Sequence, residues 1–240
     1  MKPTLDQLAR EQTAAFGGKS DPLRRGHHMD LPRILIVHNF YQQTGGEDSV
    51  VANELALLRA HGHEAHFYSV SNDEISSVVD KARVFFNIDY SHRSRRHFAQ
   101  ELARVKPDVV HAHNFFPLLT TSIYDACIDA GVPVVQTLHN FRIMCAGTYL
   151  MRDGLPCDKC VNGSPYHSVV HRCYRGSVAG SFAVARMIDV NRQRGTWREK
   201  VDRFIVLTPS AKDLFVRAGV PAGKIVVKPN FCARSGCAWR

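Results

Sequence analysis

Six short runs of apolar, mostly β-branched residues recur along the chain, and polar or glycine-containing segments separate them. Runs of this length, bounded by amphipathic segments, are typical of buried strands in a parallel sheet. The predicted strands cover residues 33–38, 65–70, 108–112, 133–138, 204–207 and 225–228.

Between these runs, apolar residues recur at helical spacing. In the segment 47–61, for example, Val50, Val51 and Leu55 share one face, and Gly62 suits the helix end. The predicted helices cover residues 47–61, 74–82, 92–105, 119–130, 177–195 and 210–218. Alternation of strands and helices predicts an α/β fold with a doubly wound, mainly parallel, Rossmann-like sheet, whose strands all end at one edge.

The tripeptide His-Asn-Phe follows three of the predicted strands, at residues 38–40, 113–115 and 139–141. Ligands of open α/β sheets bind outside the carboxyl ends of the strands. We therefore expect these strand ends to form one binding site, with contributions from Asn39, Asn114, His139 and Asn140. The alternative is that each pair simply ends a strand, because asparagine favours turns.

Two histidines, His111 and His113, alternate on one predicted strand, so their side chains point to the same face. His113 lies nearer the strand end and is the better candidate for contact with a ligand. Histidines at this spacing also suit a metal ion, but no third ligand is evident nearby. Their commoner role is buried hydrogen bonding.

Gly45 and Gly46 lie between the first predicted strand and the helix 47–61. Glycines here let a ligand approach the backbone, and a helix N-terminus offers unpaired N–H groups to an anion. Glu47 and Asp48 complement the helix dipole and disfavour phosphate, so a well-capped helix start is the alternative.

The segment 141–175 is too long and irregular for an ordinary connection, so we expect it to be functional or held by an additional interaction. It contains four cysteines, Cys145, Cys157, Cys160 and Cys173. Their arrangement suits a structural zinc ion, with His171 as a substitute ligand, and four reduced thiols are the alternative. Redox chemistry is disfavoured because the Cys-x-x-Cys pair is not expected to open a helix after a strand.

The composition indicates a folded protein with an anionic partner. Hydrophobic residues make up 45% of the 240 residues, and the formal net charge is +9. No apolar run is long enough to span a bilayer and no secretory signal is visible, which predicts a cytoplasmic protein. Arginines around the helix 177–195 suggest peripheral contact with the anionic inner face of the membrane, with a core helix as the alternative.

Three segments resemble family-4 glycosyltransferases of the GT-B fold. Residues 33–69, which include "RILIVHNFYQQTGGEDSVV", are similar to the opening of that family. Residues 106–142, which include "KPDVVHAHNFFPLL", are similar to its middle strands, and residues 200–230 to the last strands before its interdomain hinge. The resemblance covers about 33–231, so residues 30–231 are expected to form the N-terminal, acceptor-side domain, with 141–175 as a cysteine-rich insertion.

The resemblance implies retaining transfer of a hexose-type sugar from a nucleotide-sugar donor to a glycan or lipid-linked acceptor, in polysaccharide or cell-envelope biosynthesis. It implies that Gly45 and Gly46 lie near the donor phosphates and the acceptor. It also implies that His113 lies near the reacting sugar. No metal cofactor is needed for catalysis in the family, so zinc at the cysteines is structural.

The two ends depart from this pattern. Residues 1–29 are expected to form a flexible N-terminal extension. Residues 232–240 stand where a second, donor-binding domain should begin, so a truncated chain without transfer activity of its own is expected. Two other readings stay open: a non-catalytic remnant that binds an acceptor or partner, and a zinc-stabilised nucleic-acid-binding module, disfavoured because no recognition motif is visible.

Overall fold

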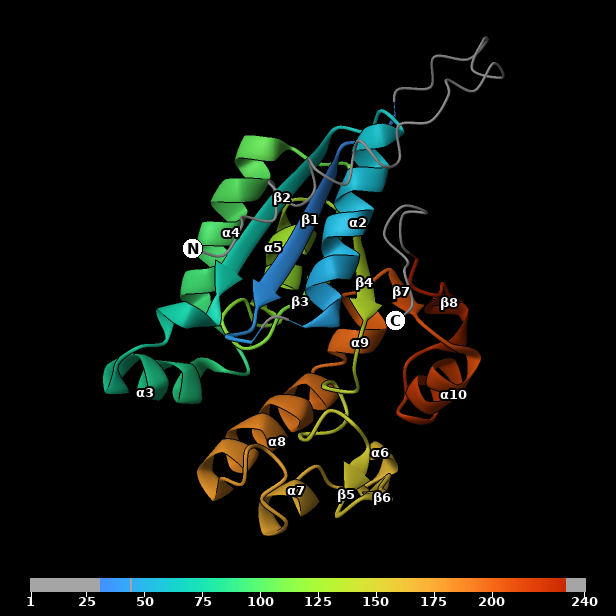
Figure 1. Cartoon of the computed structure of the whole chain (residues 1–240). Helices are drawn as coiled ribbons and strands as arrows, with labels where there is room; N and C mark the ends of the chain where they lie inside the picture. Colours follow the sequence, from blue (N-terminus) through green and yellow to red (C-terminus); the bar gives the residue numbers. More distant parts are fainter. Residues whose placement is uncertain (1–30, 44, 232–240) are drawn as a thin grey trace.

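The computed structural model describes residues 31–43 and 45–231, which form a parallel sheet flanked by helices (Figure 1). The expected extension 1–29 and the tail 232–240 lie outside these residues. The strand order is β2-β1-β3-β4-β7-β8, with neighbouring strands parallel. The strands are β1 (Ile34–Phe40), β2 (Ala65–Ser71), β3 (Val109–Asn114), β4 (Val134–Leu138), β7 (Arg203–Val206) and β8 (Ile225–Val227). The predicted fold class is confirmed.

The helices match the predicted segments with one marked shift. They are α2 (Gly46–Ala60), α3 (Val78–Asn87), α4 (His92–Val105), α5 (Ser122–Asp129), α8 (Val178–Gln193), α9 (Thr196–Glu199) and α10 (Pro209–Arg217). The prediction of a helix over 74–82 was wrong: a 3₁₀ turn covers Asn72–Glu74, and α3 begins only at Val78. The start is fixed by a capping box, because Ser77 and Asp80 each accept a hydrogen bond from the other's backbone N–H.

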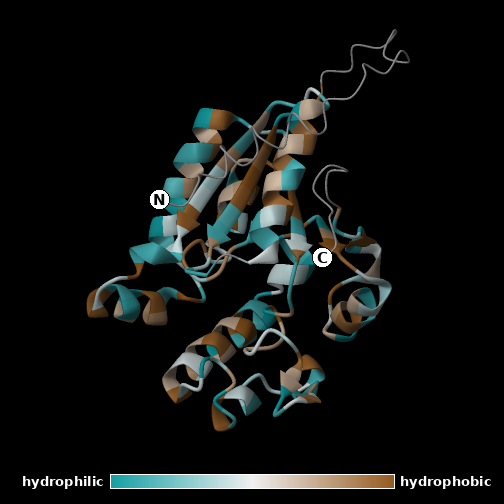
Figure 2. Ribbon diagram, viewed as in Figure 1, coloured by the Kyte–Doolittle hydropathy of each residue, from teal (hydrophilic) through white to brown (hydrophobic). Residues whose placement is uncertain are grey.

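Alternating side chains give the sheet two apolar faces. Ile34 and Ile36 of β1 pack against α2, whereas Leu35 and Val37 join the larger core with Phe98 of α4. In Figure 2, β1 carries the hydrophobic colour along most of its length, whereas β2 at the edge of the sheet is paler. Burial on both faces explains why the strands read as nearly continuous apolar runs.

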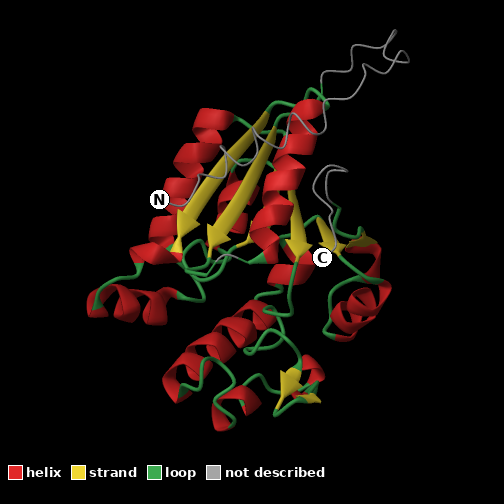
Figure 3. Cartoon of the chain, viewed as in Figure 1, coloured by secondary structure: helices red, strands yellow, loops and turns green. Residues whose placement is uncertain are grey.

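The sheet has its topological switch point at β1, which pairs with β2 on one side and β3 on the other. Figure 3 shows the arrowheads of β1, β2 and β4 pointing towards α3 and α8. Ligand sites in such sheets lie outside the carboxyl ends of the strands at the switch point. The carboxyl ends of β1 and β3 therefore mark the place to look for chemistry.

Beyond this edge lies the segment 141–175, followed by α8. The segment forms only short elements: β5 (Met151–Arg152), β6 (Leu155–Pro156), α6 (Lys159–Asn162) and α7 (His167–Val170). α8 buries one face in the main core through Ala183, Val184, Met187 and Ile188, so it is a core helix. None of the helices in the described part of the chain combines the length and apolar character that a membrane crossing requires.

Candidate functional site

Two asparagine side chains form hydrogen bonds at the switch point, where β1 and β3 end. Asn39 Nδ2 donates to Asn72 Oδ1 at 2.9 Å, and Asn39 Oδ1 accepts from Leu118 N at 2.9 Å. Asn114 Nδ2 donates to the carbonyl oxygen of Asn39 at 2.6 Å, and its Oδ1 accepts from Phe116 N at 3.0 Å. Both side chains are buried and tie together the loops that follow the strands. Ligand binding by Asn39 and Asn114 stays a prediction.

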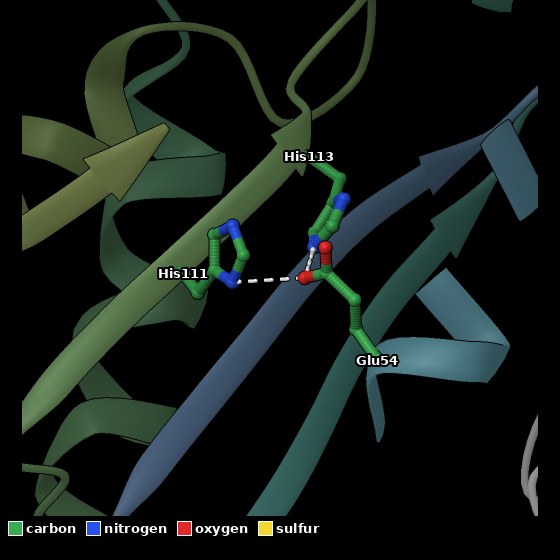
Figure 4. Close-up of side chains that lie close together, drawn as sticks. All are labelled: Glu54, His111 and His113. Atoms are coloured by element: carbon green, nitrogen blue, oxygen red, sulfur yellow. Dashed lines mark ion pairs between the residues drawn. The ribbon is translucent and has the colours of Figure 1, made fainter. Parts of the chain in front are cut away.

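Next to Asn114 along β3, the carboxylate of Glu54 lies between two histidines (Figure 4). Glu54 Oε2 lies 3.4 Å from His111 Nδ1 and 3.4 Å from His113 Nε2. The other carboxylate oxygen forms an ion pair with the ammonium group of Lys228, which follows β8. His111 and His113 face α2 because side chains alternate along β3. The sequence indicated no third group beside the two histidines, and Glu54 of α2 is that group.

Burial sets the charges in this cluster. Burial lowers the pKa of His111 and that of His113, and the raising effect of Glu54 on each is smaller. Burial by itself would raise the pKa of Glu54, but the contacts with His113, His111 and Lys228 outweigh it and hold this pKa well below its usual range. We therefore describe the cluster as a Glu54 carboxylate balanced by the Lys228 ammonium, with neutral imidazoles.

The charges fix the tautomers of the histidines. A carboxylate only accepts hydrogen bonds, so the nitrogens that face Glu54 carry protons. His113 Nδ1 is then unprotonated and accepts from His139 Nε2, 2.9 Å away. Burial and the charge of His38 lower the pKa of His139 to about 4, so His139 is neutral at pH 7. Its Nδ1 carries no proton in this tautomer and can accept a hydrogen bond from a hydroxyl group.

His139 brings this network to an open cleft of about 740 Å³ at the carboxyl edge of the sheet. Gly45 and Gly46 line the same cleft, and so do Asn140 and Arg142. His113 does not, because its side chain is fully buried behind His139. Of the predicted site residues, the structure thus brings Gly45, Gly46, His139 and Asn140 together around the cleft. Asn39, His113 and Asn114 are buried and do not line it.

The glycine loop leaves the cleft wall open. Gly45 is the N-cap of α2 with an extended backbone, so its conformation does not require glycine. A Cβ atom added to Gly46 would meet nothing within 4 Å, so the missing side chain leaves space for a ligand. Asp48 Oδ2 accepts from Gly45 N at 3.0 Å, and Asp48 Oδ1 lies 2.9 Å from His38 Nε2. The loop is therefore anchored to β1.

Neither of two groups of potential metal ligands reads as a metal site. In the described part of the chain, the ligand atoms of Glu54, His111 and His113 lie within 4.8 Å of one another, as do those of His38, Glu47 and Asp48. In the first group Lys228 already supplies the positive charge. In the second group, Asp48 caps α2 through its bond with Gly45 N, and Glu47 lines the cleft. The first group is thus a set of polar contacts around Glu54, and in the second Asp48 is held by His38 and Gly45.

Glu47 makes the stability of the protein depend on pH. Burial and the negative charge of Asp48 raise the pKa of Glu47 to about 7. The folded state thus holds this proton more tightly than the unfolded state, whose pKa is near the ordinary 4.5, and stability falls as pH rises between those values. Glu47→Gln cannot ionise, so its stability lacks this dependence on pH. We expect the difference in unfolding free energy, variant minus wild type, to be about 2 kcal/mol larger at pH 8 than at pH 5. Urea unfolding at several pH values measures this difference, and a difference that does not change with pH contradicts the assignment.

The four cysteines of the segment 141–175 are all free thiols and half-buried. The predicted substitute ligand, His171, is exposed and is not among the groups that shift the cysteine pKa values. One sequence argument was wrong in detail, because Cys157 and Cys160 do span the start of a helix, α6, after the short strand β6. Redox chemistry is still disfavoured, because burial and the neighbouring thiols raise the pKa of Cys160 to about 11, away from the thiolate form.

Much of the basic surface around α4 and α8 is paired within the protein. Arg95 contacts Asp129, Arg104 contacts Glu101, Arg186 contacts Asp89 and Lys200 contacts Asp125. Arg192 donates to the carbonyl oxygens of Cys160, Val161 and Gly163. Residues engaged in this way fix helices and loops, so the positive net charge is weak evidence for a nucleic-acid-binding surface.

Sequence reasoning missed Glu54, Lys228 and Arg142. A signal for Glu54 was present: it lies one helical turn from Val50 and Val51, on the apolar face of α2, where an ionised group needs a partner. Lys228 gave no comparable signal, because it follows the last strand and meets Glu54 only in the folded chain. Arg142 is held by stacking on Phe116, with 4.4 Å from its guanidinium carbon to the ring centroid.

Comparison with known proteins places the chain in a family. A model described as Glycosyltransferase Family 4 matches residues 44–233. A crystal structure of Anabaena Alr3699/HepE with UDP-glucose has 13% identity and a TM-score of 0.43, over 83% of this chain and 44% of HepE. The HepE complex with UDP and glucose has 15% identity and a TM-score of 0.40, over 83% and 44% of the two chains.

A carbohydrate transporter from Acidothermus cellulolyticus in complex with myo-inositol is also similar, with 11% identity and a TM-score of 0.27 over 82% of this chain and 73% of the transporter. The comparison with curated proteins finds no match. The chain spans 44% of the length of HepE. The family model covers most of the sequence, and the predicted family is thereby confirmed. The chain belongs to glycosyltransferase family 4.

Proposed function

We propose that this chain is the acceptor-side half of a retaining glycosyltransferase that moves a hexose-type sugar from a nucleotide-sugar donor to a glycan or lipid-linked acceptor. The family match over residues 44–233 carries this proposal. In this proposal a second Rossmann-like domain holds the nucleotide, and no metal ion takes part in the transfer. The product belongs to polysaccharide or cell-envelope biosynthesis.

The cleft has the groups that such a reaction needs. Arg142 and Arg175 line it and offer positive charge to the diphosphate of a donor, beside the open wall at Gly46. His139 offers an unprotonated nitrogen to a sugar hydroxyl, and Asn140 offers an amide group. We propose that His139 contacts the sugar and that His113 is a positioning residue, which fixes the tautomer and orientation of His139 through their 2.9 Å hydrogen bond.

A second hollow next to the cleft favours a lipid-linked acceptor. This groove of about 400 Å³ shares Gln42, Tyr174 and Arg175 with the cleft. Its other walls come from α3, α8 and the preceding loops. They include the apolar residues Ile75, Val84, Phe85, Ile88 and Ala183, with Asn72 and Lys81 beside them. A polar cleft that continues into an apolar groove fits an acceptor with a sugar or phosphate head and a hydrocarbon tail.

A positive charge introduced into the groove distinguishes a lipid-linked glycan acceptor from a glycan acceptor without lipid. We expect Val84→Lys to weaken binding of a lipid-linked glycan at least about tenfold, because the ammonium group loses hydration when a hydrocarbon chain covers it. Binding of the same glycan without lipid is expected to stay unchanged. Val216→Lys, on α10 outside the groove, is the control. Fluorescence titration measures both affinities, and equal loss for the two ligands removes the lipid subsite.

Peripheral contact with an anionic membrane stays a prediction. Exposed apolar side chains on α3 support it, since Val78 and Val79 are 80% and 65% exposed and Phe86 is 69% exposed. Lys81 and Arg83 of the same helix provide positive charge beside them. The buried face of α8 does not support the original form of this hypothesis, in which α8 itself rests on the membrane.

Replacement of Gly46 tests the proposed function. Gly46→Val adds a side chain to the open cleft wall, where a Cβ atom would meet nothing within 4 Å, and Gly223→Val is a matched control because its Cβ would also meet nothing within 4 Å. Each variant is assayed for transfer from a panel of nucleotide sugars, starting with UDP-glucose, to glycans and lipid-linked glycans. Acceptor binding is measured in parallel by saturation-transfer NMR.

We expect Gly46→Val to lower acceptor binding, and transfer where it occurs, at least about tenfold. Gly223→Val is expected to match the wild type. Acceptor binding with no transfer under any condition favours a non-catalytic binding protein. If neither acceptors nor nucleotide sugars bind, or if both variants behave alike, the proposed function is wrong.

A further inference from the structure

The segment 141–175 adopts a costly backbone with little regular structure to hold it. It contains five of the seven non-glycine residues with positive φ among those the structure describes: Thr148, Leu150, Asp153, Arg172 and Arg175. Such conformations cost of the order of 1 kcal/mol each and persist only where the surroundings enforce them. Its helices and strands are four residues long or shorter. An additional interaction is therefore needed to hold this segment.

Its four cysteines come from separate parts of the segment, which the fold ties together. A Cβ atom added to Gly147 would lie 3.9 Å from Cys145 Sγ and 3.8 Å from Cys173 Cβ, so these two residues approach each other across Gly147. Cys160 Sγ lies 3.9 Å from the carbonyl oxygen of Pro165, which also accepts from Ser168 Oγ at 2.7 Å, and Ser168 O accepts from Cys173 N at 3.0 Å. The turn that carries Cys157 and Cys160 is thereby linked to the loop that carries Cys173.

We propose that Cys145, Cys157, Cys160 and Cys173 together bind one zinc ion, which is structural. Cys157 and Cys160 supply two ligands from the turn that opens α6, and Cys145 and Cys173 supply the other two from the flanking loops. A zinc ion takes four thiolates in a tetrahedral site at about 2.3 Å. Binding replaces four S–H bonds with four Zn–S bonds and releases four protons to solvent.

The surrounding chain is arranged to accept this ion. Arg192 of α8 donates to the carbonyl oxygen of Cys160 at 2.5 Å and to that of Gly163 at 2.9 Å, which fixes the turn. Cys157 N donates to Leu150 O at 2.8 Å, and Cys173 N donates to Ser168 O at 3.0 Å, which fixes two more ligands. No three cysteine sulfurs in the described segment lie within 4.8 Å of one another. In this proposal, rotation about the Cα–Cβ bonds, between staggered positions, would bring them onto one ion.

Zinc here would also shape one wall of the cleft. Arg142 and Thr148 lie on either side of Cys145 in the sequence. Tyr174 and Arg175 come directly after Cys173. These four neighbours of the cysteines all line the cleft. Arg142 donates to the carbonyl oxygen of Ala146, inside the same loop, at 2.6 Å. The metal would thus hold the cleft wall without taking part in transfer. This inference does not depend on the proposed function, because its test measures metal and not activity.

The test begins with metal analysis of the full 240-residue chain purified under reducing conditions. We expect about one zinc ion per chain, and cobalt substitution should give the visible absorption and strong thiolate charge-transfer bands of a tetrahedral thiolate site. Cys160→Ser should reduce bound zinc at least about fivefold. Cys127→Ala, which removes a buried thiol of α5 outside the segment, should leave zinc unchanged, and so should the double variant Cys232→Ser/Cys237→Ser.

Three outcomes would overturn the proposal. One is protein without metal that also fails to take up cobalt. Another is zinc that persists when all four cysteines are replaced. The third is peptide mapping of metal-free protein, alkylated in denaturant without reductant, that finds two of these four cysteines joined in a disulfide. If Cys160→Ser does not fold, chelation of the wild type replaces it: removal of zinc should lower the melting temperature, and added zinc should restore it.

Discussion

Replacing Glu54 with alanine is expected to lower the free energy of unfolding by about 3 kcal/mol. The carboxylate is buried, and its removal leaves the Lys228 ammonium and the protonated nitrogens of His111 and His113 without the acceptor that they face. The estimate lies at the low end of values for a broken buried pair, because the Lys228 side chain is 38% exposed and can regain some hydration.

Two further variants show whether this cost comes from stranded charge. Glu64→Ala removes an exposed carboxylate that pairs with Arg33, so we expect a change below about 1 kcal/mol. Adding Lys228→Met to Glu54→Ala removes the unpaired ammonium and should restore part of the lost stability. Urea unfolding gives all the values. The cluster contributes no special stability if Glu54→Ala costs no more than Glu64→Ala.

The second large effect concerns turnover. In a sugar-transfer assay of this chain joined to a donor-binding domain, we expect His139→Ala and His113→Ala each to lower kcat/KM about 100-fold, the usual order for loss of a positioned imidazole. The two histidines act in series, because His113 orients the His139 ring that reaches the cleft. The double variant should therefore be little worse than either single variant, since residues that act as a unit are not additive.

His111→Ala is the matched control for this series. His111 contacts the same Glu54 oxygen at the same 3.4 Å, but its other nitrogen bonds to Thr137 Oγ1 at 2.8 Å and does not reach His139. Its loss should lower turnover less than about tenfold. Because His113 is fully buried, each variant is assayed well below its own melting temperature. Equal losses for His111→Ala and His113→Ala would mean that the histidines only stabilise the fold.

His113 also shows where the sequence argument stopped. Its position in the sequence correctly indicated a place at the carboxyl end of β3, and the expectation that it contacts a ligand followed from that position. The structure places His139 of the neighbouring loop in front of it. Burial also means that His113→Ala should cost stability as well as turnover.

The sequence by itself determined the layers of this protein. Strands such as β1 and helices such as α2 follow from apolar periodicity, which is a local property of the chain. The shared carboxyl edge follows from the handedness of parallel crossovers. The start of α3 was mispredicted because capping by Ser77 outweighed the apolar residue before it, Ile75.

Only the tertiary structure decided which polar groups meet. Glu54 and Lys228 lie 174 positions apart, and their contact exists only because α2 and the end of β8 approach the same strand edge. The protonation of the histidines depends on burial, which no local pattern specifies. The cleft at Gly46 and His139, and the approach of Cys145 and Cys173 across Gly147, likewise arise from packing between segments that are separate in the chain.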